Sequence, residues 1–319
     1  MFRLPLSLVS PAGERGRLSI LIFHRVLPAS DPLFPELPSA ADFEARMRWV
    51  AAWFNVLPLG RAIDMLYAGT IPSRALAITF DDGYADNEEL AAPILKRLGM
   101  TATFFVSTGF LGQGCMWNDQ VIEAIRGSDS EEIDLRALGL TSYPLTSIAE
   151  RRRAVSSVLT GIKHLEPGLR QSLTDAIVAA TGGKPSPAPM MQPQQVRSLR
   201  ALGMDVGAHT VTHPILSRLN PAAALDEMCR SKRDLEQILG EPVGLFAYPN
   251  GVPEQDYAVE HATMARECGF SAAVTTAWGA ASMRSDRFQL PRFSPWDRTR
   301  LRYGARLLGN FARSEQVAV

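Results

Sequence analysis

The sequence predicts an α/β fold built on parallel strands, and two observations support this prediction. Short apolar runs of strand length alternate along the chain with longer segments in which apolar residues recur at helical spacing. Hydrophobic residues make up 46% of the 319 residues and charged residues 21%, which is enough for a sizeable core. Parallel strands can close into a barrel or form an open sheet, and either arrangement places an active site at their carboxyl ends.

The expected strands are apolar runs bounded by polar or turn-forming residues. They cover residues 18–23, 55–57, 75–80, 102–106, 204–209, 243–249 and 271–276. The helical patterns between them cover residues 42–54, 61–68, 88–98, 193–202, 220–239 and 255–268. The helix at 220–239 has the clearest signals, because Asn220 is a favoured N-cap, Pro221 a favoured first residue and Gly240 a favoured stop.

The alternating pattern is interrupted over about 112–190, where charged helical stretches replace the apolar strands. We interpret this region as a helical insertion in one main domain that covers 18–297. Residues 1–17 form an N-terminal extension, and 298–319 form a C-terminal helix or tail. Leu301, Leu308 and Phe311 of this last segment are expected on one helical face covering the domain. A peripheral contact with a membrane is the alternative for this segment, because it also carries several arginines.

The composition narrows the partners and the compartment. The chain has 33 basic residues (Lys plus Arg) and 33 acidic residues (Asp plus Glu). It therefore has no overall electrostatic field that would attract nucleic acid. No apolar run approaches the ~20 residues of a membrane-spanning helix. The N-terminal segment that precedes the first expected strand is shorter than a typical signal peptide and is interrupted by Pro5. We therefore expect a cytoplasmic protein. Cys115, Cys229 and Cys268 lack CxxC spacing, and we expect free thiols in a reducing compartment. The oligomeric state is not indicated.

Polar residues follow several of the expected strands. Asp81 and Asp82 come directly after the strand at 75–80 and are followed by a glycine. His24, His209 and Asn250 follow three other strands. The carboxyl ends of parallel strands meet at one edge, so these side chains are expected to converge there.

The histidines and aspartates suit a hydrolytic metal centre. His209 and His213 have the spacing at which two imidazoles can share one metal ion. Two histidines and one carboxylate leave room for water and substrate, and a second carboxylate can then act as base. Each of these two motifs, taken alone, also has a non-catalytic explanation. Two aspartates before a glycine often form a solvated turn, and paired histidines are often packed or exposed at the surface.

Three segments carry a family resemblance, namely TFDDGY (79–84), HTVTHP (209–214) and FAYPNG (246–251). They resemble, in order and separation, motifs of the NodB-homology polysaccharide deacetylases, carbohydrate esterase family 4, over about 18–295. The resemblance implies a distorted (β/α)7 barrel that removes N- or O-acetyl groups from sugars with a divalent metal ion. Zn²⁺ is the ion we expect first, with Co²⁺ or Ni²⁺ as alternatives.

The same resemblance implies roles for individual residues. Asp81 corresponds to the general base, and the metal ligands correspond to Asp82, His209 and His213. The backbone N–H of Asn250 corresponds to a donor to the oxyanion, and Thr210 to a support for the histidine loop.

Two departures from the family pattern concern the base and the general acid. Ala247 stands where many members have an arginine that tethers the base. Arg292 is the candidate replacement, and the alternative is a surface arginine. No histidine follows His261, which we expect to be exposed on a helix. The segment LIFHRV resembles a rearranged subgroup, associated with exopolysaccharides, in which the first strand supplies the acid. His24 is therefore the candidate, with a packed histidine as the alternative.

The candidate substrate-binding residues are Tyr84, Trp117, Asp119, Tyr248 and Pro249. Aromatic rings stack on the apolar faces of sugars, although a core position is the favoured interpretation for both Trp117 and Tyr248. Trp278 and Trp296, near the last strand ends, are candidates for the wall of the substrate pocket.

These inferences together predict an enzyme that hydrolyses N-acetyl groups of N-acetylglucosamine-type residues in a bacterial polysaccharide or its precursor. The expected partner is an acetylated carbohydrate. An O-acetyl esterase on the same scaffold and a catalytically silent carbohydrate-binding barrel are the alternatives.

Overall fold

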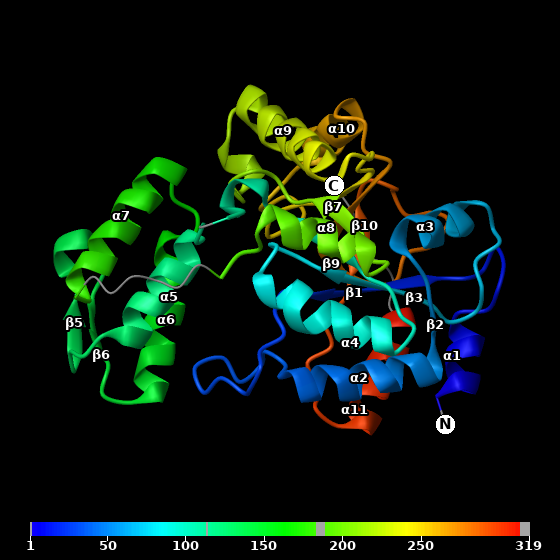
Figure 1. The fold of residues 1–319 in the computed structure, drawn as a ribbon, viewed down its shortest axis with the longest axis horizontal. Helices are drawn as coiled ribbons and strands as arrows, with labels where there is room; N and C mark the ends of the chain where they lie inside the picture. The colour runs from blue at the N-terminus through cyan, green and yellow to red at the C-terminus, as the bar shows by residue number, and fades with distance from the viewer. Residues whose placement is uncertain (1, 113, 183–188, 313–319) are drawn as a thin grey trace. The chain divides into compact units, whose positions relative to one another are not determined.

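The computed structural model describes residues 2–112, 114–182 and 189–312, and these form two compact units. The first unit comprises Met1–Ala29, Pro38–Leu111 and Met191–Val319, and the second comprises Ser30–Leu37 and Gly112–Met190 (Figure 1). The insertion expected at 112–190 corresponds to the larger segment of the second unit. The short segment Ser30–Leu37 was not anticipated as part of it.

Among the described residues, seven parallel strands follow one another around a nearly closed barrel. Their order is β1 (Leu18–Phe23), β3 (Ala75–Phe80), β4 (Thr103–Val106), β7 (Asp205–Ala208), β8 (Leu245–Ala247), β9 (Ala272–Trp278) and β10 (Leu290–Arg292). A short strand, β2 (Asn55–Val56), pairs with β3 beside this path. Phe293, just past β10, closes the ring, because its N–H donates to Ile20 O at 2.8 Å and its carbonyl accepts from Ile22 N–H at 3.1 Å.

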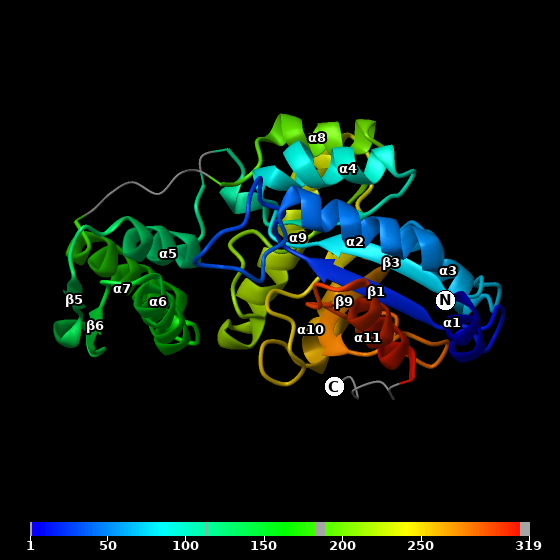
Figure 2. The same cartoon turned by 90° about the horizontal axis from the view of Figure 1, so that it is seen from below.

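Helices cover the outside of these strands. They are α2 (Ala40–Trp53), α3 (Leu59–Tyr67), α4 (Ala92–Arg97), α8 (Pro193–Ala201), α9 (Pro221–Leu239), α10 (Val259–Glu267) and α11 (Arg300–Ala312). Figure 2 shows α2, α3, α4 and α8 on one side of the strands and α10 and α11 on the other. Stacked rings of Phe23, Phe80 and Phe104 tie three adjacent strands into the core, with centroids 5.4 and 4.8 Å apart.

Local signals explain several element boundaries. The Asn220 side chain accepts from Ala223 N–H at 2.9 Å, and Gly240 ends α9 in the left-handed region at φ 72°. The expected helix at 88–98 is divided, since a π-helical turn, η1 (Asn87–Ala91), precedes α4, whose first turn contains Pro93. Two 3-10 turns complete the connections of this unit, η2 (Thr108–Phe110) and η4 (Leu216–Arg218).

Both ends of the first unit contain a helix. The N-terminal extension, for which no element was predicted, contains α1 (Arg3–Val9), which packs against α11. The helix α11 was predicted, but its buried face differs, because Leu301 is exposed while Tyr303, Leu307 and Phe311 are buried. The remaining residues 313–319 of the predicted tail lie outside the described residues. In the described part of the chain, no helix is both long enough and apolar enough to cross a membrane.

The second unit is mainly helical, as expected for the insertion. It contains α5 (Trp117–Gly127), α6 (Ile148–Ile162), α7 (Pro167–Ala180), the antiparallel pair β5 (Glu132–Asp134) and β6 (Ser142–Pro144), and the 3-10 turn η3 (Arg136–Leu138). It has its own apolar core, to which Leu33 contributes. Arg126 of α5 pairs with Asp31 at 2.7 Å, which attaches the Ser30–Leu37 segment to the helices.

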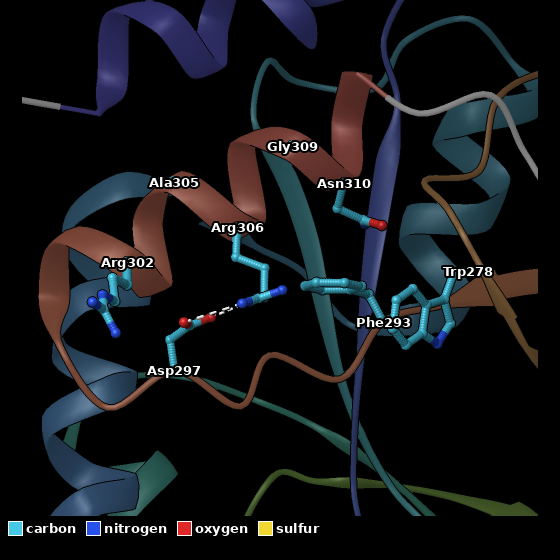
Figure 3. A pocket seen from close by; sticks show the side chains of 8 residues that line it. All are labelled: Trp278, Phe293, Asp297, Arg302, Ala305, Arg306, Gly309 and Asn310. Carbon is cyan, nitrogen blue, oxygen red and sulfur yellow. Dashed lines mark hydrogen bonds and ion pairs between the residues drawn. The ribbon is translucent and has the colours of Figure 1, made fainter.

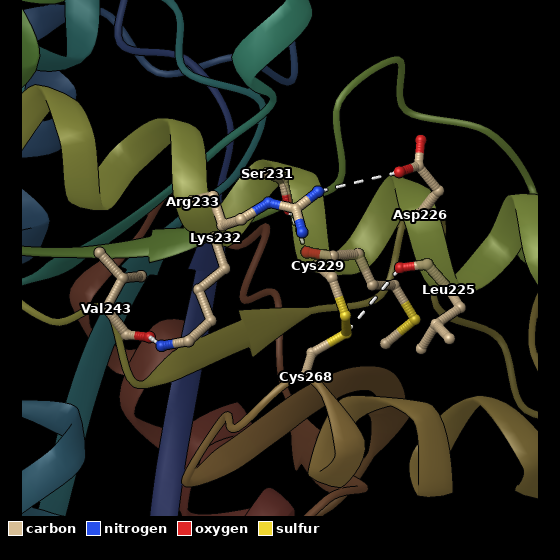
Figure 4. The surroundings of a disulfide bond; sticks show 9 residues. Leu225, Asp226, Cys229, Ser231, Lys232, Arg233, Val243 and Cys268 are labelled. Carbon is tan, nitrogen blue, oxygen red and sulfur yellow. Dashed lines mark hydrogen bonds and ion pairs between the residues drawn. A yellow bond between two sulfur atoms is a disulfide. The ribbon is translucent and has the colours of Figure 1, made fainter.

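The structure corrects the prediction of free thiols. Cys229 of α9 and Cys268, the residue that follows α10, form a disulfide with Cα atoms 5.0 Å apart (Figure 4). The prediction was wrong because it relied on spacing along the chain, whereas the packing of α10 against α9 brings these residues together. Cys115, in the second unit, takes no part in this bond. The disulfide also removes the ground on which the cysteines favoured a reducing compartment.

Candidate active site

The carboxyl ends of the strands bring the predicted motifs together within the first unit. The paired aspartates follow β3, His209 follows β7, and Arg292 is the last residue of β10. His24 follows β1 directly, and the first residue after β3 donates its N–H to the carbonyl of Phe23 at 2.9 Å. The parallel register therefore places His24 beside Asp81.

Asp82 and the two histidines form a potential metal site. Asp82 Oδ1 lies 3.5 Å from His209 Nε2 and 3.4 Å from His213 Nε2. One ligand atom of each residue lies within 4.8 Å of the others. Asp82 Oδ1 is buried, yet it accepts no hydrogen bond from any described residue. A buried carboxylate oxygen without a donor is costly, and a cation at this position would satisfy it. The residues present therefore fit a divalent metal ion.

The hydrogen bond of His209 and the low pKa of His213 suit ligation. His209 Nδ1 lies 2.7 Å from the carbonyl of Ala247, which can only accept, so Nδ1 carries the proton and Nε2 can be a ligand. Burial lowers the pKa of His213 to about 4, against the opposing effect of Asp82, so His213 is neutral at pH 7. For His209, burial disfavours the charged ring, but the Asp81 and Asp82 carboxylates outweigh it and raise the pKa. The two acids thus favour a positive charge beside them.

Asp81 is held by Arg292 in a buried bidentate ion pair. Two nitrogens of the guanidinium reach the two carboxylate oxygens at 2.6 Å each. The Arg292 Nε–H donates to Thr275 O at 2.8 Å, and Nη1 donates to Thr79 Oγ1 at 3.2 Å. Arg292 is fully buried, so the alternative of a surface arginine was wrong. Burial is the largest effect and alone would raise the pKa of Asp81, but Arg292 together with His209 and His24 outweighs it and lowers the pKa, so Asp81 stays a carboxylate.

The site has an unusual backbone. Among the described residues, six non-glycine residues have positive φ, and four of them belong to the three motifs. These are Asp82 at 78°, Thr210 at 62°, His213 at 52° and Asn250 at 59°. Such conformations cost energy and persist where the surrounding structure enforces them, typically at functional sites.

The loop after β1 is fixed by two residues that the sequence did not single out. Asn87 Nδ2 donates to His24 O at 2.8 Å, and Asp86 accepts from Arg25 Nε at 2.8 Å and from Val26 N–H at 3.1 Å. The side chain of His24 is exposed, so the alternative of a packed histidine was wrong. Asp86 and Asn87 stand just after the TFDDGY motif, but nothing in the local sequence indicates contact with the first strand.

The loop that carries both histidines (209–214) is also supported by a residue that the sequence did not single out. The Glu227 carboxylate, on α9, accepts from Val211 N–H, Thr212 N–H and Thr212 Oγ1, each at 2.8 Å. Thr210 Oγ1 accepts from His213 N–H at 3.1 Å, as its predicted supporting role requires. Glu227 carries no sequence signal, because it looks like any polar residue on an amphipathic helix.

The third motif provides a backbone donor. Asn250 is half-buried, and no described residue accepts a hydrogen bond from its N–H. Its carbonyl accepts from Thr276 Oγ1 at 2.7 Å, which anchors the turn. Pro249 is buried behind it.

Two candidate aromatic residues of this unit are buried. The structure contradicts a contact between the Tyr248 side chain and a sugar, because that side chain is fully buried. It stacks on Tyr257 at 4.1 Å and donates its hydroxyl to Phe288 O at 2.9 Å. Tyr84 is also buried, with the Arg25 guanidinium 4.5 Å above its ring.

Other candidates lie away from this edge of the barrel or in the other unit. Trp117 and Asp119 are on α5 of the second unit, where Arg170 lies 4.9 Å from the Trp117 ring and Asp119 is buried. Their substrate-binding role stays a prediction. His261 was expected to be exposed, but the structure shows it buried. Its Nδ1 accepts from Ala258 N–H at 3.0 Å and caps α10.

The fold and the site define the class of the protein, a parallel-strand barrel enzyme with an acid–histidine centre at its carboxyl edge. The family model described as polysaccharide deacetylase matches residues 68–273, and the chain belongs to this family, whose members are hydrolases that deacetylate carbohydrates. His24 and Arg292 lie outside the matched residues, so the family match does not bear on their roles, which the geometry of the site supports.

Individual proteins are similar to this chain. YxkH of Bacillus subtilis (strain 168), to which polysaccharide deacetylase activity is provisionally assigned, is 24% identical over 279 residues, 87% of this chain and 71% of YxkH. The Streptococcus pyogenes deacetylase PplD, solved with acetate, is 19% identical with a TM-score of 0.58, covering 87% of this chain and 92% of PplD. IcaB of Ammonifex degensii is 19% identical with a TM-score of 0.57, covering 92% of this chain and 98% of IcaB. The likeness to these structures confirms the predicted (β/α)7 barrel.

Proposed function

We propose that this protein is a divalent-metal-dependent deacetylase that hydrolyses N-acetyl groups of N-acetylglucosamine-type residues in a bacterial polysaccharide or its precursor. Membership of the polysaccharide deacetylase family supports the reaction type. The observation that carries the proposal is the gathering of Asp82, His209 and His213 next to a carboxylate, Asp81, that Arg292 keeps charged.

Asp82, His209 and His213 would hold the metal ion, and Zn²⁺ suits a set of two imidazoles and one carboxylate. Co²⁺ and Ni²⁺ are the alternatives. A bound ion would polarise the acetyl carbonyl and lower the pKa of a water molecule.

The protein's own groups supply the proton transfers. The Asp81 carboxylate takes the proton of the attacking water, and the guanidinium of Arg292 holds this carboxylate in place. The Asn250 N–H donates a hydrogen bond to the acetyl carbonyl oxygen, on which negative charge develops. His24 delivers a proton to the departing amine nitrogen, so that acetate and a free amino sugar leave.

The test is acetate release from N-acetylated oligosaccharides after loading the protein with Zn²⁺ or Co²⁺. Asp81→Asn should reduce turnover by about 100- to 10,000-fold and retain the metal, because only the base is lost. Asp226→Asn, on the exposed face of α9, is the matched control and should behave as the parent. Absence of acetate release with either ion, or full activity of Asp81→Asn, would contradict the proposal. Parallel assays on O-acetylated sugars test the esterase alternative.

A further inference from the structure

A second pocket lies on the outer side of the barrel, between α11 and the ends of β9 and β10 (Figure 3). Its volume is about 430 Å³, which is within the range of small-molecule sites. Its walls combine aromatic and polar side chains. The principal ones are Trp278, Phe293, Asp297, Arg302, Arg306 and Asn310. Phe293 directly follows Arg292, and successive residues of a strand point to opposite faces, so this pocket is distinct from the site inside the barrel edge.

Aromatic rings form one wall. Trp278 meets Phe293 edge to face with centroids 5.9 Å apart, and it lies 5.6 Å from Trp296. Trp278 is 38% exposed and Trp296 is 47% exposed. Neighbouring exposed tryptophans are unusual in a soluble domain and are typical of a surface that binds a ligand.

An ion pair provides both donors and acceptors beside this wall. Arg306 pairs with Asp297 through two nitrogens (Figure 3). The Arg306 guanidinium also lies 3.7 Å from the centroid of the Trp296 ring. Arg306 is thus fixed from two directions. Because the two charges compensate each other, this pair offers hydroxyl groups both donors and an acceptor, while Arg302 adds one positive charge to the lining.

Asn310 adds a buried acceptor that has no partner. Its side chain is 1% exposed, and Nδ2 donates to Gly279 O at 3.0 Å and to Ser19 Oγ at 3.2 Å. These bonds determine the orientation of the amide and leave Oδ1 without a hydrogen-bond partner among the described residues. An unsatisfied buried acceptor is costly, so a ligand that donates a hydrogen bond would relieve this cost.

We propose that this pocket is a second carbohydrate site, which binds a pyranose unit through ring stacking on Trp278 and hydrogen bonds to Asn310 and the Arg306–Asp297 pair. A pyranose has both an apolar face and hydroxyl groups that donate and accept. A simple phosphate could pair with Arg302, but it would leave the aromatic wall and the Asp297 acceptor unused. The choice of a glycan rests on the proposed function, but binding here requires neither the metal site nor turnover.

The experiment measures by calorimetry the affinity for soluble N-acetylglucosamine oligomers of two linkages. The protein carries Asp82→Ala and is treated with chelator, so that no metal ion is bound at the hydrolytic site. Binding should persist in this background. Trp278→Ala should weaken it by about tenfold, because the stacking surface is lost. Leu301→Ala is the control, since Leu301 is on α11, like Arg306 and Asn310, but lines a different pocket. Asn310→Ala should also weaken binding, and a melting curve checks its stability.

Two results would overturn the proposal. One is the absence of binding in the Asp82→Ala background, and the other is an unchanged affinity in Trp278→Ala. Trp278 is partly exposed, so its variant should fold even if the Asn310 variant does not. Failure of acetate release with intact binding would count against the proposed function alone, which separates the two ideas.

Discussion

Two adjacent aspartates at one strand end have different partners. Asp81 faces Arg292 inside the barrel, whereas Asp82 faces the two histidines. The left-handed conformation of Asp82, at φ 78°, helps consecutive carboxylates take separate positions. One acid can therefore bind metal while its neighbour stays available for a proton.

The buried ion pair should be essential for stability as well as activity. Arg292→Ala should lower the free energy of unfolding by about 3–5 kcal/mol, because it leaves the Asp81 charge buried and unpaired. Arg292→Lys keeps the charge but loses the planar fork, so it should fold better than Arg292→Ala and still lose turnover. Urea unfolding and acetate release measure the two effects.

The control for this pair is Arg61→Ala, which removes an exposed arginine from α3. It should leave both stability and turnover unchanged. An Arg292→Ala variant as stable as the parent would show that the pair is not required.

His24 should affect turnover without affecting metal content. His24→Ala should reduce acetate release by about 100- to 10,000-fold, because the amine would leave without its proton donor. Metal analysis of the same sample should give the parental value, since His24 is not one of the three ligands. His261→Ala, which removes a buried capping histidine, is a control that should lower stability but not the turnover of folded protein. Near-normal turnover in His24→Ala would refute its assignment as the acid.

At the scale of elements, local pattern predicted most of the barrel but little that depends on distant contacts. Apolar runs identified most of the strands, and the cap signals of α9 gave its ends within a residue. The sequence did not indicate α1, the β5–β6 pair or the buried face of α11, because each depends on packing against remote segments. The three motifs were likewise recognisable, whereas Glu227, which supports the second motif, and Asp86, which fixes the loop after β1, look like ordinary polar residues.

The disulfide between α9 and α10 should stabilise the barrel. It joins residues 39 positions apart, so it restricts the unfolded chain. Cys229→Ser should lower the free energy of unfolding by about 4 kcal/mol under oxidising conditions. Denaturant unfolding with and without reductant measures this effect, and the reduced parent should resemble the variant. Cys115→Ser is the control and should be neutral. Equal stability of parent and Cys229→Ser would show that the bond contributes nothing.

At the scale of the whole molecule, metal binding should be coupled to stability. Binding to the native state alone should add about 2.7 kcal/mol when free Zn²⁺ is about one hundred times its Kd. Chelation should therefore lower the melting temperature, and added Zn²⁺ should restore it. Asp82→Ala should show no such dependence, because it removes one of the three ligands. A melting temperature that is insensitive to chelator in the parent would argue against the site.

The closure of the barrel through Phe293 has a consequence for biosynthesis. Asp81 and Arg292 are 211 positions apart, and their pairing requires the last strand to dock beside the first. Contacts between such distant segments form late and slow the folding of a chain. On the ribosome, a nascent chain in which Arg292 has not yet been translated would hold the Asp81 base without its counterion, so competence for catalysis should appear only after Arg292 has been synthesised and β10 has docked.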